Sequence, residues 1–183
     1  MKHGFKAQAN RIALEMRREF GLAPEAPMCP FILCEHFEIR VLPLSQFSDE
    51  AAYFLSEGSS AFSAVTVQRG INRAIVHNDS HSVVRQHSNL MHELAHAFLG
   101  HPPCEAFDED GERVYSSDIE QEANFLAGCL KVTNEAAWHI VKNGLQSTAP
   151  EIYKVSNAML NWRLQVSGAN IRAMRSKSKR RAS

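Results

Sequence analysis

The sequence lacks net charge, long apolar runs and a recognisable targeting segment. Twenty Lys and Arg residues balance twenty Asp and Glu residues, which argues against a uniformly basic nucleic-acid-binding protein. No apolar run approaches the ~18 residues that span a bilayer, so we expect no membrane contact. Residues 1–20 carry charges in every turn, whereas a secretory signal needs an uninterrupted apolar core.

Cysteines at paired short spacings are also missing. The four cysteines are Cys29, Cys34, Cys104 and Cys129. Their scatter excludes a zinc site built on CxxC pairs, and we expect reduced thiols in a cytoplasmic protein. What is present, 183 residues of which 44% are hydrophobic and 22% charged, is typical of a globular domain that buries a core.

Hydrophobic periodicity predicts an α+β fold in which a helix precedes a small antiparallel sheet and further helices follow. The expected strands are residues 38–44, 61–68 and 71–77, the last two joined in a hairpin at Arg69-Gly70. The expected helices are residues 5–20, residues 31–36, a long helix from Ser80 or Ser82 to Leu99, one from Asp118 to Lys131, and two or three short ones within 134–166. Residues 105–117 are acidic and predict an exposed loop.

The long helix carries the chemistry in the segment His92-Glu93-Leu-Ala-His96. Residues i and i+4 lie about 40° apart on a helix and one turn along it, so both imidazoles face one point, as two corners of a tetrahedral Zn²⁺ site require. Glu93 lies beside that point and is placed to take a proton from a water that the ion acidifies.

A third ligand must come from another segment, and the helix from Asp118 offers Glu120 and Glu122. We favour Glu120, because it shares a helical stripe with small residues that permit close approach to the His helix. Asn124, one turn on, could accept the outer N–H of a ligand His and orient it. On a continuing helix His101 would lie about 140° from His96, so we interpret it as facing away from the site.

The two segments His92-Glu-Leu-Ala-His96-Ala-Phe-Leu-Gly-His and Glu120-Gln-Glu-Ala-Asn124-Phe-Leu-Ala together resemble the ImmA/IrrE family of zinc metallopeptidases. The stretch Arg85-Gln-His-Ser before the metal helix and the stretch Tyr153 to Leu164 are similar to the family as well. The resemblance implies that His92, His96 and Glu120 are zinc ligands and that Glu93 is the general base. It also implies a compact zincin-like core, a small sheet beside the metal helix.

The resemblance further implies the domain plan and the partner. We expect a metallopeptidase core at 1–131 and a helix-turn-helix-like helical segment at 132–171. Residues 172–183 are basic and too polar to pack, so we expect a disordered tail there. The family is implicated in cleaving helix-turn-helix repressors, which here would be a separate chain.

Two functions remain open on these residues. The first is a zinc-dependent endopeptidase of narrow specificity that cleaves a repressor, with His87 and Tyr115 as unchosen candidates for steadying the oxyanion. The second is a regulatory module that binds a repressor or DNA through a peptidase-like fold without cutting. A helix that reads DNA would expose polar side chains in the terminal segment, namely Asn157, Asn161, Arg163 and Gln165. We favour the first function, because Glu93 would have no catalytic role in a module that does not cut.

Overall fold

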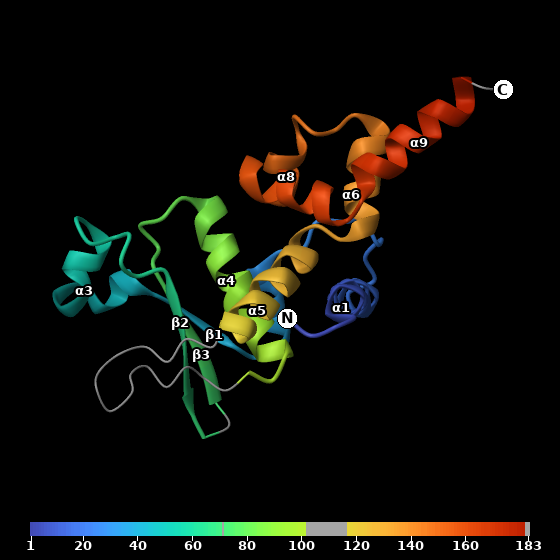
Figure 1. The fold of residues 1–183 in the computed structure, drawn as a ribbon. Helices are drawn as coiled ribbons and strands as arrows, with labels where there is room; N and C mark the ends of the chain where they lie inside the picture. Colours follow the sequence, from blue (N-terminus) through green and yellow to red (C-terminus); the bar gives the residue numbers. More distant parts are fainter. Residues whose placement is uncertain (71, 102–116, 182–183) are drawn as a thin grey trace. The chain divides into compact units, whose positions relative to one another are not determined.

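The computed structural model describes residues 1–70, 72–101 and 117–181, and Figure 1 shows its helices and strands. The helices are α1 (Phe5–Glu19), α2 (Pro30–His36), α3 (Ser48–Leu55), α4 (Val83–Phe98), α5 (Ser117–Lys131), α6 (Asn134–Asn143), α7 (Ala149–Tyr153), α8 (Asn157–Val166) and α9 (Ala169–Arg181), with one 3-10 turn, η1 (Leu44–Phe47). The strands are β1 (Arg40–Pro43), β2 (Ala64–Arg69) and β3 (Asn72–His77). The predicted α+β class is confirmed. Cys104 and residues 105–116 of the predicted acidic loop, which include Tyr115, lie outside the described residues.

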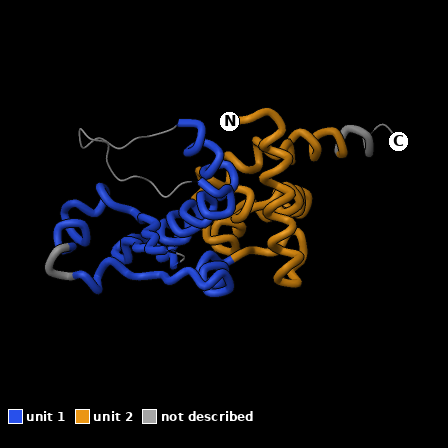
Figure 2. The backbone as a smooth tube through the Cα atoms, turned by 90° about the horizontal axis from the view of Figure 1, so that it is seen from below, with its two compact units in different colours: residues 1, 29–127 blue, residues 2–28, 128–183 orange. Residues whose placement is uncertain are grey.

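The chain divides into two compact units, coloured in Figure 2. Unit 1 comprises Met1 and Cys29–Ala127, and unit 2 comprises Lys2–Met28 and Gly128–Ser183. This division differs from the predicted boundary after residue 131, because α1 bonds to the segment that follows α5. The Asn10 carboxamide contacts Glu135 and the backbone N–H of Asn134, which ties the N-terminal helix to unit 2.

The sheet of unit 1 is mixed, with strand order β1-β3-β2. β2 and β3 form the predicted antiparallel hairpin, in which Val65 pairs with Val76. β1, however, pairs in parallel with β3, with Val41 opposite Ile75. The expectation of a wholly antiparallel sheet was wrong, because η1 and α3 supply the crossover that a parallel strand needs.

Helix α4 carries an amphipathic pattern and contacts β2 and β3 (Figure 1). Its start is set by Ser82, whose hydroxyl accepts a hydrogen bond from the backbone N–H of Arg85. Its buried face consists of Leu90, Met91, Leu94 and Ala95. Burial of this stripe fixes the rotation of α4 about its axis. It therefore determines which side chains lie on the other faces of the helix.

Unit 2 is an assembly of helices around an apolar core. That core is made of Val132, Ala136, Ala137, Ile140, Ala149, Tyr153, Val155, Leu160, Leu164 and Ala169. The helical structure of α9 continues to Arg181, so it extends into the segment 172–183 that the sequence predicted to be disordered. Near the start of α9, Arg172 lies over the Trp138 ring at 4.2 Å, and this cation–π contact gives the basic segment a packing partner.

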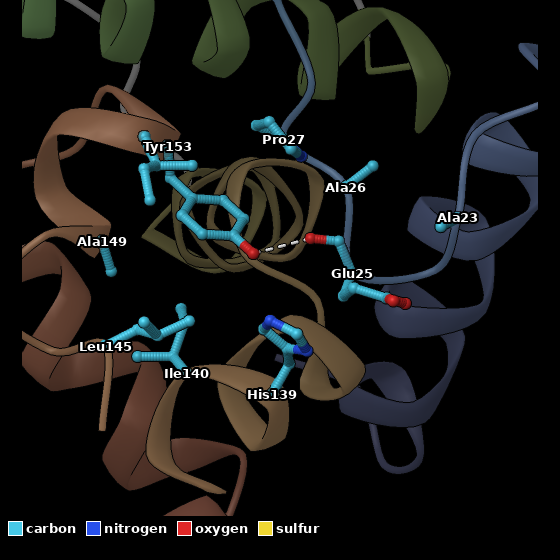
Figure 3. A pocket seen from close by; sticks show the side chains of 10 residues that line it. Ala23, Glu25, Ala26, Pro27, His139, Ile140, Leu145, Ala149 and Tyr153 are labelled. Atoms are coloured by element: carbon cyan, nitrogen blue, oxygen red, sulfur yellow. Dashed lines mark hydrogen bonds between the residues drawn. The ribbon is translucent and has the colours of Figure 1, made fainter. Parts of the chain in front are cut away.

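A cavity of about 310 Å³ lies within unit 2 (Figure 3). The loop before α2 forms one wall, and Ile140, Leu145 and Ala149 provide apolar lining. The Tyr153 hydroxyl donates a 2.6 Å hydrogen bond to the Glu25 carbonyl. This bond joins the loop to the end of α7.

Thiols and helix hydropathy are the remaining features of the described residues. Cys29, Cys34 and Cys129 are free thiols, and burial raises the pKa of Cys34 to about 12. Among the described helices, none is both long and apolar enough to cross a bilayer.

Candidate metal centre

Three donor side chains converge in unit 1. The Nε2 atoms of His92 and His96 lie 3.0 Å apart. Glu120 in the first turn of α5 directs Oε2 to His92 Nε2 and Oε1 to His96 Nε2, each at 3.3 Å. Among the described residues, this is the one His, Cys, Asp and Glu group whose geometry could hold a metal ion.

These separations fit a zinc ion. Zn–N and Zn–O bonds of about 2.0–2.1 Å in tetrahedral geometry place neighbouring ligand atoms about 3.3–3.4 Å apart. The three observed separations are 3.0, 3.3 and 3.3 Å. Two neutral imidazoles and one carboxylate are also a donor set that suits zinc. His92, His96 and Glu120 therefore could hold Zn²⁺ with little rearrangement.

The protonation state of His96 agrees with a ligand role. The pKa of His96 is lowered to about 4, first by burial and then by the neighbouring His92, while Glu93 opposes the shift. The imidazole is therefore neutral at pH 7, and a metal ligand must be neutral to offer its lone pair. Only 19% of its side chain is exposed.

Glu93 lies next to the histidines on α4, and a strand residue holds its carboxylate. The Thr66 hydroxyl on β2 donates a 2.5 Å hydrogen bond to Glu93 Oε2. β2 is an edge strand of the sheet, so the Glu93 carboxylate faces the sheet edge. Thr66 was missed by sequence reasoning, because nothing in a β-branched run shows which of its residues will face α4.

The structure separates the two candidate glutamates. Glu122 is buried, with 6% of its surface exposed, and its Oε2 lies 3.9 Å from His101 Nε2. It does not join the group of three donors, whereas Glu120 does. Two residues along a helix are about 200° apart, so only one of the two carboxylates can face α4 at this point.

His101 does not face away from the site. Its Nδ1 lies 3.0 Å from His96 Nδ1. The expectation was wrong because it assumed a continuing helix, whereas α4 ends and Gly100 adopts a φ of 64°. This left-handed residue reverses the chain and returns His101 towards His96.

The remaining candidates lie elsewhere. Asn124 is on the exposed side of α5, and within the described residues its amide makes no hydrogen bond to His92 or His96, so the orienting role expected for it is not supported. His87 packs edge-on against Phe31, with ring centroids 5.5 Å apart. Arg163 is fully buried, so it cannot be one of the exposed DNA-reading side chains.

Comparison with known proteins agrees with this geometry. No curated protein and no solved structure matched the chain. The family model of the IrrE N-terminal-like domain, a peptidase family, matches residues 34–166. That range is most of the chain and contains all three converging donors, Glu93 and Thr66. The chain belongs to the ImmA/IrrE family of metallopeptidases.

Proposed function

We propose that the protein is a zinc-dependent endopeptidase of narrow specificity. The observation that carries the proposal is the convergence of His92, His96 and Glu120 beside a carboxylate held by its own hydrogen bond. A zinc ion held by these three side chains would supply Lewis acidity, polarising the scissile carbonyl and lowering the pKa of an attacking water. Three protein ligands leave a fourth position open, as catalytic zinc sites require.

Glu93 is the general base in this proposal. Because Thr66 occupies Oε2, the other carboxylate oxygen remains to accept the proton from the attacking water. The same carboxylate then delivers that proton to the leaving amine nitrogen, so the proton balance closes without a second acid. The hydrogen bond from Thr66 also limits rotation of the carboxylate, which keeps the accepting oxygen in one place.

The substrate that we propose is a helix-turn-helix repressor on a separate chain, cleaved to relieve repression. The family membership supports a protein substrate, and the resemblance of the two motifs supports the narrower class. We also propose a zincin-like core, in which α4 carries two metal ligands and the base, α5 carries the third ligand, and the mixed sheet lies beside α4.

Residues 132–171, which contain α6 to α8 and the start of α9, are proposed to form a helix-turn-helix-like segment after the core. Asn157, Asn161 and Gln165 are exposed on α8, which leaves a polar face available to a partner. The buried Arg163 instead donates hydrogen bonds to the Val132 carbonyl and to Asn134. This segment is therefore better suited to docking a protein partner than to reading bases through Arg163.

The test compares the protein with its Glu93→Gln variant. Metal analysis of protein prepared without added metal should find about one zinc per chain in both, because Glu93 is not a ligand. His92→Ala and Glu120→Ala should each lose the zinc. An extract of the native host cells is then incubated with each protein, and new protein N-termini are identified by labelling.

New N-termini within a repressor-type regulator should appear with the unchanged protein and be absent with zinc-loaded Glu93→Gln. Identical sets of N-termini would overturn the peptidase proposal. Retained binding of a repressor by both proteins would then support the non-cleaving module.

A further inference from the structure

We propose that His101 and Glu122 form an outer pair that fixes the tautomer and orientation of His96 for metal binding. The inference rests on the proposed function, because it concerns the same metal centre. It assigns roles to two residues that are neither metal ligands nor the base. His101 contacts His96 directly, and Glu122 lies behind His101.

The imidazoles of His96 and His101 are in direct contact. A 3.0 Å separation between His96 Nδ1 and His101 Nδ1 requires one nitrogen to carry hydrogen and the other to accept it. His96 Nε2 faces Glu120 and His92, so Nε2 must offer its lone pair if it binds metal. The hydrogen of neutral His96 then resides on Nδ1 and is donated to His101.

The tautomer of His96 determines the tautomer of His101. Because its Nδ1 accepts, a neutral His101 carries its hydrogen on Nε2. That nitrogen lies 3.9 Å from Glu122 Oε2. The Glu122 carboxylate is thus placed to stabilise this tautomer electrostatically. Metal-bound histidines commonly donate their second N–H to a carboxylate or another acceptor, which orients the ring and raises its basicity.

Backbone hydrogen bonds at the end of α4 hold His101 next to His96. The backbone N–H of His101 donates to the His96 carbonyl at 3.0 Å, and that of Gly100 donates to the Ala97 carbonyl at 3.1 Å. With Gly100 in the left-handed region, these are the two bonds of a Schellman motif, which brings the residue after the glycine against the residue three positions before the cap. The helix end itself therefore places the His101 ring edge-on against His96.

The side chains of His101 and Glu122 are largely shielded from solvent. The His101 and Glu122 side chains are 10% and 8% exposed. Water therefore competes weakly at this position, and a hydrogen bond or charge interaction is stronger there than at an exposed one. The pair can hold the His96 ring before metal arrives, which lowers the entropy lost on binding.

The test measures zinc affinity by competition with a chromophoric chelator. His101→Phe keeps a ring but removes the acceptor, and we expect about 10- to 100-fold weaker zinc binding. His101→Asn places an amide oxygen near the position of Nδ1, so it should recover most of the loss. The matched control is His87→Phe, which removes a half-buried imidazole from α4 and should leave the affinity unchanged.

A spectroscopic measurement separates orientation from general packing. The visible absorption spectrum of the Co²⁺-loaded protein should change in His101→Phe and remain close to that of the unchanged protein in His101→Asn. Unaltered zinc affinity in His101→Phe would overturn the inference. Equal losses in both His101 variants would also overturn it, because they would show a packing role.

Glu122→Gln gives an independent measurement, because it removes the charge and keeps the shape of the side chain. We expect weaker zinc binding than in the unchanged protein, and undiminished affinity would overturn the part assigned to Glu122. If the unchanged protein bound no zinc, the proposed function itself would fail. If it bound zinc and His101 had no effect, only the outer pair would fail.

Discussion

At the scale of single residues, the candidate site depends on a contact from outside the segment His92–His96. Glu93 occurs within the motif, but Thr66 on a strand limits its orientation through a hydrogen bond. A hydrogen bond to a charged acceptor contributes about 1.5–3 kcal/mol. In the proposed mechanism, a Glu93 carboxylate that rotated freely would offer its proton-accepting oxygen at the correct position for only part of the time.

Replacing Thr66 tests this positioning. Thr66→Val removes the hydroxyl and keeps the β-branched shape, so the strand should be retained. We expect kcat for the cleavage found with the unchanged protein to fall about 10-fold or more, as loss of one such hydrogen bond implies. Zinc affinity should stay constant, and Thr66→Ser should restore most of the activity. Full activity in Thr66→Val would show that the bond does not serve catalysis.

At the scale of elements, the end of α5 is held by a buried arginine. Arg17 on α1 donates hydrogen bonds to the carbonyls of Leu130, Ala26 and Ala13. The last carbonyls of a helix have no partner within it, and Arg17 donates to two of them, those of Leu130 at 2.9 Å and Lys131 at 3.5 Å. Burial lowers the pKa of Arg17 to about 10, which still leaves it charged at neutral pH.

Close packing against α8 explains a glycine within α5. A Cβ at Gly128 would lie 2.5 Å from the Trp162 ring. Gly128→Ala would ordinarily stabilise a helix by up to about 1 kcal/mol, but overpacking costs about 1–3 kcal/mol. We therefore expect a lower free energy of unfolding, measured by denaturation in urea.

The control for this substitution shortens the opposing ring. Trp162→Phe removes the atoms that meet the new methyl group, so Gly128→Ala should be less destabilising in that background than in the unchanged protein. Equal effects in both backgrounds would show that the ring does not set the cost.

At the scale of the whole molecule, buried imidazoles link stability to pH. Burial lowers the pKa of His77, with Asp79 opposing this shift, and the pKa of His96 is lowered to about 4. The unfolded chain takes up these protons near pH 6.5, before the folded one does. Stability is therefore complete above pH 6.5 and falls as the pH decreases towards 4.

The prediction applies to metal-free protein in the presence of a chelator. Between pH 6.5 and pH 4 the free energy of unfolding should decrease by up to about 1.4 kcal/mol per pH unit on account of His96. Urea denaturation followed by circular dichroism at several pH values measures this slope. His96→Gln should flatten the slope, and an unchanged slope in that variant would show that other groups cause it.

Local patterns alone were enough for several features. The pairing of His92 with His96 follows from helix periodicity, and the Ser82 cap, the hairpin of β2 and β3, and the extent of α1 follow from short-range rules. The choice of Glu120 over Glu122 was also reached from the small residues on its stripe, and the geometry places Glu120 with the histidines.

Other features were decided only when segments packed together. No local spacing encodes four of these features: the parallel pairing of β1, the hydrogen bond of Thr66 to Glu93, the burial of Arg163, and the edge-on contact of His101 with His96. Helix and strand periods determine which side chains share a face of one element. Which face meets another element depends on burying the apolar stripes of both, and that is a property of the folded chain.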